Sequence, residues 1–383
     1  MAEPVRVPVK KEIWHWALRE SQKDEAEFYG RFPQAEKWLK QERNPTFKQL
    51  ESAAKYLQIP FGYMFLDTPP KENVMEIEFR SISNKIPQIS KDLQDTILEM
   101  DRRRNWMSDY RKDLGWTKLD IIKDFNEQKS GDIAADAKLA KRLLNLPEYW
   151  YTRLKDLDQT FGFLKEKLEH IGILVMRNGI VGNNTRRSLD INEFRAFMLY
   201  DDVAPLIFIN NNDSKAGKIF SLIHEYFHVL FEQEDVVLDP YVQTTPDEQQ
   251  INALTAEFLM PQEQIFGLWD RRADVLEQIN RLSSYFKVSR LAFAIKLNSL
   301  GLVHRDIVER VRLESVKDFE KKTDSSKRAN FYPTYYSRMS RVFLETVIRS
   351  VESGEIGYTY AFKLLGVKGK TFDRIKADVM PYG

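Results

Sequence analysis

The stretch that most restricts the fold of this chain is the mainly apolar segment 221–231, which contains the pattern His-Glu-x-x-His. We expect one helix there, and a separation of four residues then places His224 and His228 on one face, about 6 Å apart along the axis. Both imidazoles can therefore reach one metal ion. Glu225 lies beside that face, where a carboxylate can deprotonate a water rather than bind the metal. The pattern predicts a zinc site with Glu225 as general base.

The His-Glu-x-x-His pattern is rare enough to carry weight. With only 5 histidines in 383 residues, chance matches are expected on the order of one in two hundred such chains. The alternative interpretation is a purely structural one, in which His224 and His228 pack on an amphipathic helix and hydrogen-bond to their neighbours.

A catalytic zinc ion needs a third protein ligand and an open position. The chain has no cysteine, so every ligand must offer nitrogen or oxygen. Glu248 is the best candidate, because Pro246 precedes it as a plausible helix opening. Asn252, one turn later, can hold a ligating carboxylate or a histidine N–H in place. Two alternatives stay open: Glu248 as an ordinary glutamate favoured by the helix dipole, and Glu257 as a weaker rival ligand.

The residues around these candidates form a longer pattern. Glu248 and Asn252 are followed by Phe258-Leu259-Met260-Pro261, and the segments 192–197 and 204–210 precede the predicted zinc helix. This pattern resembles the ImmA/IrrE family of intracellular zinc metallopeptidases. The resemblance implies a zincin-like domain with a small β-sheet.

The resemblance also implies specific roles for the motif residues. Zinc would be bound by His224, His228 and Glu248, with Glu225 as the catalytic base. The substrate would be a specific protein, often a DNA-binding repressor or a similar antitoxin-like partner. Tyr226-Phe227 depart from the small residues usual in this family between the histidines, and this departure bears on the shape of the pocket.

The length of the chain and the distribution of its apolar residues limit the number of domains and the kind of protein. A chain of 383 residues suggests several domains, and no apolar run is long enough for a membrane span. We expect a cytoplasmic protein with no membrane partner, of α+β class and predominantly helical. The expected domains are a helix-turn-helix bundle at 1–70, a helical connector at 71–148, the metallopeptidase domain with its following helices at 149–304, and a basic helical region at 305–383.

Short helices with tight joints are predicted for residues 1–70. Their order resembles the repressor-like domain fused to many longer ImmA/IrrE members, with the helix at 33–40 as the recognition helix. DNA is therefore an expected partner, and the candidate contacts are Lys37, Lys40, Arg43 and Lys48. Nearby acidic residues dilute this basic group, so a bundle used for protein contacts is the alternative.

Between the bundle and the zinc helix we expect a strand at 74–80 and long helices at 91–114 and 134–146. The three arginines at 102–104 are interpreted as a solvated helix face, with contact to nucleic acid as the alternative. Farther along, a helix at 161–170 should precede the strands 171–176, 197–200 and 206–209, a small sheet that can bind an extended peptide by strand addition.

Two other side chains in this region have a structural and a functional interpretation. Arg195 is expected to form a surface salt bridge, with oxyanion stabilisation as the alternative. His170 is expected to be a structural group at a helix end.

The proposed activity has competitors. One is a non-enzymatic regulator, in which the bundle and the basic region 305–383 bind DNA or a protein and the zinc is structural. Another is a toxin or phage-defence effector, which would use the same zinc chemistry on a different target. The complete set of metal ligands with Glu225 favours an enzyme, because a structural zinc has no need of that residue and prefers a fourth protein ligand.

Overall fold

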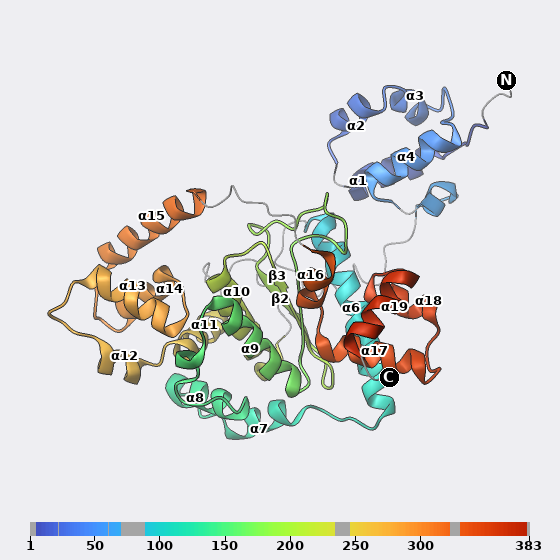
Figure 1. The fold of residues 1–383 in the computed structure, drawn as a ribbon. Helices are drawn as coiled ribbons and strands as arrows, with labels where there is room; N and C mark the ends of the chain where they lie inside the picture. The colour runs from blue at the N-terminus through green and yellow to red at the C-terminus, as the bar shows by residue number, and fades with distance from the viewer. Residues whose placement is uncertain are drawn as a thin grey trace. The chain divides into compact units, whose positions relative to one another are not determined.

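A computed structural model describes residues 5–21, 23–59, 61–69, 89–233, 246–321 and 330–380, the side chains of 316–321 excepted. The chain folds as two compact units, Met1–Asp95 and Thr96–Gly383, and each unit has a hydrophobic core of its own. The described part is mainly helical with one small sheet (Figure 1), which agrees with the predicted α+β class. The predicted strand at 74–80 lies outside the described residues, and the domain boundaries within the second unit stay predictions.

The first unit is a bundle of short helices: α1 (Lys11–Ser21), α2 (Glu25–Arg31), α3 (Ala35–Leu39), α4 (Phe47–Leu57) and the 3-10 turn η1 (Phe61–Phe65). Its core is aromatic, with Trp14 stacked on Trp38 at 5.7 Å between ring centroids and packed against Phe28. The Thr46 side chain begins α4 in a capping box with Gln49. Apolar spacing and caps thus account for these helices.

The sheet of the second unit has three short strands: β1 (Leu174–Asn178), β2 (Ala196–Leu199) and β3 (Leu206–Asn210). Their order is β1-β3-β2, with β1 parallel and β2 antiparallel to β3. All three strands were predicted close to these positions. The first begins later than predicted, because Gly172 adopts a left-handed backbone (φ 99°) in the turn after the preceding helix.

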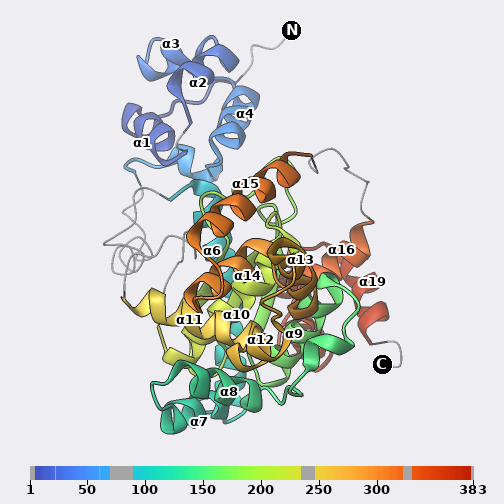
Figure 2. The same ribbon diagram turned by 90° about the vertical axis from the view of Figure 1, so that its left-hand side faces the viewer.

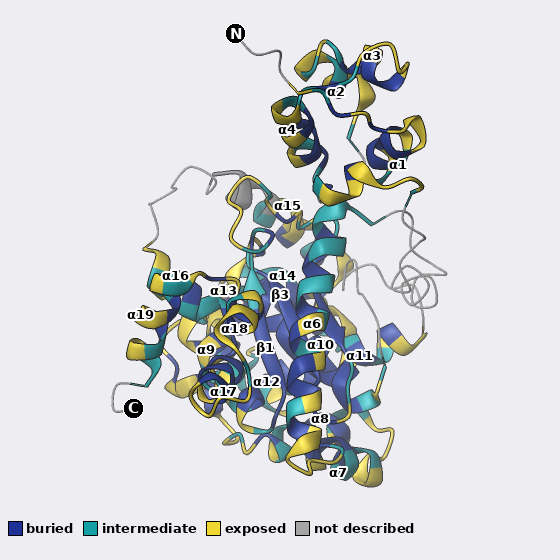
Figure 3. Ribbon diagram, turned by 90° about the vertical axis from the view of Figure 1, so that its right-hand side faces the viewer, coloured by how far each residue is buried: buried dark blue, intermediate teal, exposed yellow. Residues whose placement is uncertain are grey.

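Helices cover both faces of this sheet. On one face lie α9 (Leu157–His170), α10 (Lys215–Phe231) and α11 (Pro246–Leu259), and on the other lie α6 (Lys91–Asp113), α16 (Phe331–Arg338), α17 (Arg341–Glu352), α18 (Tyr358–Leu365) and α19 (Gly369–Val379) (Figures 1 and 3). Side chains alternate between the faces along each strand. Val175 and Ile207 accordingly join the core around α10, whereas Met176 and Phe208 face a cavity beside α6.

The remaining helices of the second unit extend the core around α10: α7 (Asp120–Gln128), α8 (Ile133–Leu143), η2 (Trp150–Arg153), α12 (Gln262–Leu268), α13 (Val275–Phe286), α14 (Arg290–Ser299) and α15 (Arg305–Lys321). Figure 2 shows α12, α13 and α14 grouped beside α10 and α11. Helices α7 and α8, which the sequence places in a connector, contribute residues to this same core. Within the described residues, no helix combines the length and the apolar character needed to cross a bilayer.

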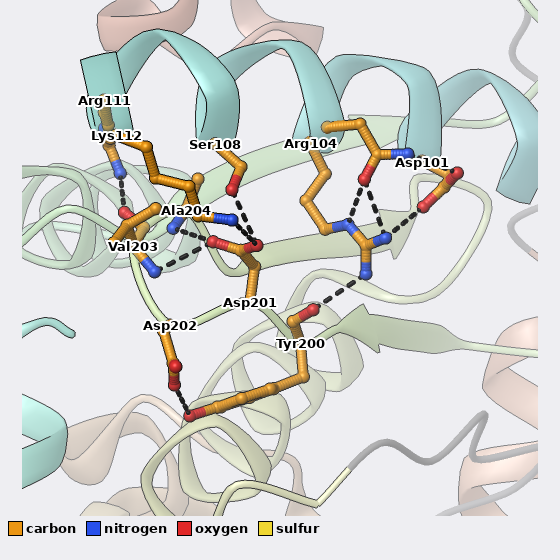
Figure 4. Close-up of polar contacts among 11 residues, drawn as sticks. Asp101, Arg104, Ser108, Arg111, Lys112, Tyr200, Asp201, Asp202, Val203 and Ala204 are labelled. Atoms are coloured by element: carbon orange, nitrogen blue, oxygen red, sulfur yellow. Dashed lines mark hydrogen bonds and ion pairs between the residues drawn. The ribbon is translucent and has the colours of Figure 1, made fainter. Parts of the chain in front are cut away.

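Buried polar contacts tie α6 to the sheet (Figure 4). Arg111 Nη1 donates to the carbonyl oxygens of Gly172 and Val203, each at 2.6 Å, and Ser108 Oγ donates to Asp201 at 2.8 Å. Burial lowers the pKa of Arg111 to about 10, against the opposing charge of Asp201. The guanidinium is thus a structural cation that two carbonyls satisfy.

The prediction of a solvated face at residues 102–104 was wrong for Arg103. Its side chain is buried, and Arg104 donates to the Tyr200 carbonyl at 2.8 Å, while Arg102 is exposed. Charge runs usually face solvent, but here the helix is covered by the sheet and the C-terminal helices, which supply carbonyl acceptors.

Candidate metal centre

Helix α10 is buried nearly all round, which suits a rigid support. Ser214 caps its first turn by accepting from the Gly217 N–H, and it ends where Glu232 takes a left-handed conformation. The helix begins at Lys215, earlier than the predicted start at 221, because of this cap. A helix apolar on every side packs in the centre of a domain. The motif residues are therefore held by neighbours from the sheet and from the surrounding helices.

The structure brings the three predicted ligands together from α10 and α11. His224 Nε2 lies 3.0 Å from His228 Nε2, and the Glu248 carboxylate oxygens lie 3.4 Å and 3.2 Å from these two nitrogens. All three residues are buried, and one ligand atom from each falls within 4.8 Å of the others. Glu248 therefore faces the two histidines from the first turn of α11, as predicted.

These separations fit a metal ion. Ligand atoms about 2.0–2.2 Å from a tetrahedral ion lie about 3.3–3.6 Å from one another, close to the three distances above. Two imidazole nitrogens and a carboxylate are electron-pair donors, and their convergence in a buried place calls for a cation between them. The group therefore suits a divalent metal that accepts nitrogen and oxygen ligands.

The protonation states of the group also suit metal binding. Burial lowers the pKa of His224, which favours the neutral imidazole. Burial alone would raise the pKa of Glu248, but hydrogen bonds and charge from His224 and His228 outweigh it and hold this pKa at about 2. A neutral imidazole and an ionised carboxylate are the forms that bind a metal.

Asn252 lies beside His224. It is close enough to His224 to raise the pKa of that imidazole, against the larger effect of burial. Its buried Oδ1, however, makes no hydrogen bond of normal geometry with the described residues, and neither do the Nδ1 atoms of His224 and His228. The amide is thus placed near a ligand without a regular bond to it.

Glu225 is buried, at 1% exposure, on the same helix as the two histidines. The two large residues that follow it point into the core: the Tyr226 hydroxyl donates to the Ala140 carbonyl at 3.2 Å, and the Phe227 ring packs against Phe258. The large side chains of Tyr226 and Phe227, which replace the family's usual small residues, therefore pack in the core against α8 and α11.

The rival candidates have other partners. The carboxylate of Glu257 pairs with Lys296 at 2.6 Å, both largely buried, and so lies outside the metal group. The exposed His170 bonds through Nδ1 to a carbonyl of its own helix. Arg195 pairs with Asp213 at 2.8 Å, so it forms a salt bridge as predicted, but Asp213 is buried and the pair does not lie on the surface. Asp213 could not be identified from the sequence, because the two partners belong to different parts of the chain and share no local pattern.

The four candidate DNA contacts are all exposed on the first unit. Lys40 forms an ion pair with Glu36 at 2.6 Å, one turn apart on the helix surface. The DNA contacts predicted for Lys37, Arg43 and Lys48 stay predictions.

Comparison with known proteins supports the enzyme class. Residues 168–298 match the family model described as the IrrE N-terminal-like domain, a family of metal-dependent peptidases, and residues 339–377 match the model of a domain of unknown function. Searches of curated proteins and of solved structures found no match. Neither family match reaches the N-terminal bundle. The first range contains all four motif residues, which supports the ImmA/IrrE resemblance and a metallopeptidase-type function.

Proposed function

We propose that the chain is a zinc-dependent endopeptidase that cleaves a specific protein. The observation that carries this proposal is the buried convergence of His224, His228 and Glu248 with Glu225 on the same helix. Zinc held by the first three residues would supply Lewis acidity that polarises the scissile carbonyl. A structural zinc prefers a fourth protein ligand, and no fourth histidine or acidic side chain joins the group in the described part of the chain.

The remaining chemistry falls to residues of the chain. Glu225 removes a proton from the attacking water and passes it to the leaving amine, which is ordinary general base and general acid catalysis. Burial of this carboxylate keeps bulk water away from the proton it carries. Helix α10 fixes its distance from the two imidazoles.

The sheet offers a place for an extended substrate. Strand β2 lies at an edge and, among the described strands, pairs only with β3. An edge strand can pair with an added peptide through its free main-chain groups. Because β2 packs against α10, a peptide added there would run beside the metal helix.

We propose a DNA-binding repressor or an antitoxin-like protein as the substrate. The ImmA/IrrE resemblance supports this class, and so does the bundle of short helices ahead of the peptidase part. Exposed Lys37, Arg43 and Lys48 would let the bundle contact DNA phosphates and bring the enzyme to a DNA-bound target. Cleavage would then derepress a mobile element or a stress or defence response.

The test incubates the protein with candidate DNA-binding repressors from the genome that encodes it. Wild type should bind zinc and cut one of these repressors, Glu248→Ala should lose both abilities, and Glu225→Gln should keep the metal but lose cleavage. Mass spectrometry of the fragments checks cleavage, and elemental analysis checks the metal. Cleavage by Glu225→Gln at the wild-type rate would overturn the mechanism. Repressors all left intact by zinc-loaded wild type would favour the regulator, or an effector with another target.

A further inference from the structure

A second polar site lies on the face of the sheet that α10 does not cover. A small cavity, partly open to solvent, is lined by residues of α6, β1, β3 and the C-terminal helices α16 and α18. Three arginines line it, together with one carboxylate: Arg103, Arg177, Arg338 and Glu99. Because three guanidinium groups face one carboxylate, the cavity carries excess positive charge.

Arg103 keeps donor capacity toward this cavity. The side chain is buried; its Nη2 pairs with Glu99 at 2.5 Å and its Nε donates to the Leu364 carbonyl at 2.9 Å. Its Nη1, however, reaches only the sulfur atoms of Met100 and Met176 among the described residues, at 3.8 Å and 3.6 Å. Thioether sulfur is a weak acceptor, so these strong N–H donors lack an adequate partner.

The other two arginines lack a carboxylate partner. Arg177 Nε donates to the Ser337 carbonyl at 2.9 Å, and its guanidinium lies 4.8 Å from the Phe161 ring. Arg338 Nε is buried and has no hydrogen-bond partner among the residues that the structure describes. Neither arginine forms an ion pair within the described part of the chain, and burial lowers the pKa of both. Removing such charges from water lowers the stability of the folded protein unless an anion compensates them.

We propose that this cavity binds a phosphate group, either free phosphate or the phosphate of a small monoester. A guanidinium presents a planar fork of donors that matches phosphate oxygens, and phosphate carries between one and two negative charges near neutral pH. That charge matches the excess left by Arg177 and Arg338 after Glu99 has paired with Arg103.

The site also has a structural consequence. Its arginines come from α6, β1 and α16, three parts of the chain far apart in sequence. A phosphate bound by all three would hold the C-terminal helices against the sheet. Because a ligand that binds only the folded form stabilises it by mass action, phosphate should raise the unfolding temperature of the full chain.

The experiment measures thermal unfolding of the full-length, zinc-loaded protein in rising inorganic phosphate at fixed ionic strength, and in glycerol phosphate as the monoester. We expect a saturable rise in unfolding temperature. Arg338→Gln should weaken the apparent affinity roughly tenfold or more, because it removes a charge-assisted contact. Arg349→Gln is the matched control, since this exposed arginine of α17 lies outside the cavity lining, and it should respond as wild type does.

Two further variants separate loss of phosphate binding from loss of folding and from loss of the metal. Arg338→Met should unfold without phosphate at the wild-type temperature or higher, because it removes an unpaired cation, and should lose the phosphate response. Glu248→Ala should keep the response, which separates this site from the metal group. Tighter binding of inorganic phosphate would identify the free ion, and tighter binding of the monoester a phosphorylated metabolite. No saturable rise with either, or equal responses from Arg338→Gln and Arg349→Gln, would overturn the proposal.

Discussion

The two faces of the three-stranded sheet carry buried or partly buried charged groups of opposite sign. On the α10 face, two imidazoles and the Glu248 carboxylate converge as electron-pair donors. On the α6 face, three guanidinium groups line one cavity with a single carboxylate, that of Glu99, which pairs with Arg103. The protein supplies no counter-charge that fully balances either group, and charge removed from water requires such compensation. A sheet of only three short strands can therefore separate a site for a cation from a site for an anion.

The largest effect is expected from Glu248→Ala, which removes one of three ligands from the α10 face. Metal affinity should fall by more than about 100-fold, the upper range already seen when only an outer partner of a ligand is lost. Peptidase activity should disappear with the metal. Equilibrium dialysis followed by elemental analysis measures the affinity. Asp247→Ala, an exposed acidic neighbour on the same helix turn, should bind metal as wild type does. Equal losses in both variants would show that the carboxylate of Glu248 is not a ligand.

The next effect contrasts two arginines on the α6 side. Arg111→Met should cost about 2–4 kcal/mol of unfolding free energy, because it leaves the buried carbonyls of Gly172 and Val203 without a donor. Arg338→Met, which removes a cation without an acidic partner, should leave the unfolding free energy unchanged or raise it. Denaturant unfolding measures both. The exposed Lys112→Met controls for the loss of one positive charge. Similar costs for the two arginine variants would contradict the distinction between a satisfied cation and an unsatisfied one.

A smaller loss is expected from Asn252→Ala beside the metal group. Partners of metal ligands typically contribute about 10–100-fold to affinity, and the Asn252 side chain lies close to the ligand His224. Competition with a chromogenic chelator measures the change, with the exposed Gln249→Ala as control. An unchanged affinity would mean that the amide does not support the site once metal is bound.

The smallest effect concerns a cation on the α10 side. Burial lowers the pKa of Lys141 to about 8 from its ordinary 10.5, against the opposing charge of Glu257. Between pH 8 and pH 10.5 the unfolded chain binds more protons than the folded chain, so the free energy of unfolding rises with pH across this range. Below pH 8 the ammonium group is charged in both states, and the folded protein bears the full cost of burying that charge. Because the side chain still reaches solvent, we expect Lys141→Met to stabilise the protein by only about 1 kcal/mol at pH 7.

Unfolding curves from pH 7 to 10.5 test this expectation. The advantage of Lys141→Met over wild type should shrink as pH rises through 8. An advantage that stays constant across this range would assign the effect to packing instead of charge, since Lys141 also lies 5.7 Å from the Phe258 ring.

The metal group could be predicted from the sequence, whereas the arginine cavity could not, and the difference has a physical reason. His224, Glu225 and His228 follow helical spacing, and Glu248 begins the helix described next along the chain. Local geometry therefore brings most of the group together. By contrast, the run at Arg103 has the appearance of an ordinary charged surface, and only packing of α6 against β1 and α16 buries it.

The fold shows the same limit. Alternating apolar residues and caps predicted the strands and most helices, because those signals are local. The order β1-β3-β2 was not predictable from the strand pattern, since a mixed parallel and antiparallel sheet depends on which helix covers each face.

The hydrogen bond from Arg103 to the Leu364 carbonyl joins residues at opposite ends of the second unit. A chain growing on the ribosome cannot close this contact until Leu364 has been translated, whereas α10 and its sheet emerge well before. Until then Met176 and Phe208 have no cover from the C-terminal helices. Termination of translation between α15 and α16 would therefore leave a nascent protein with an intact metal motif and an open apolar flank, which chaperones and proteases recognise.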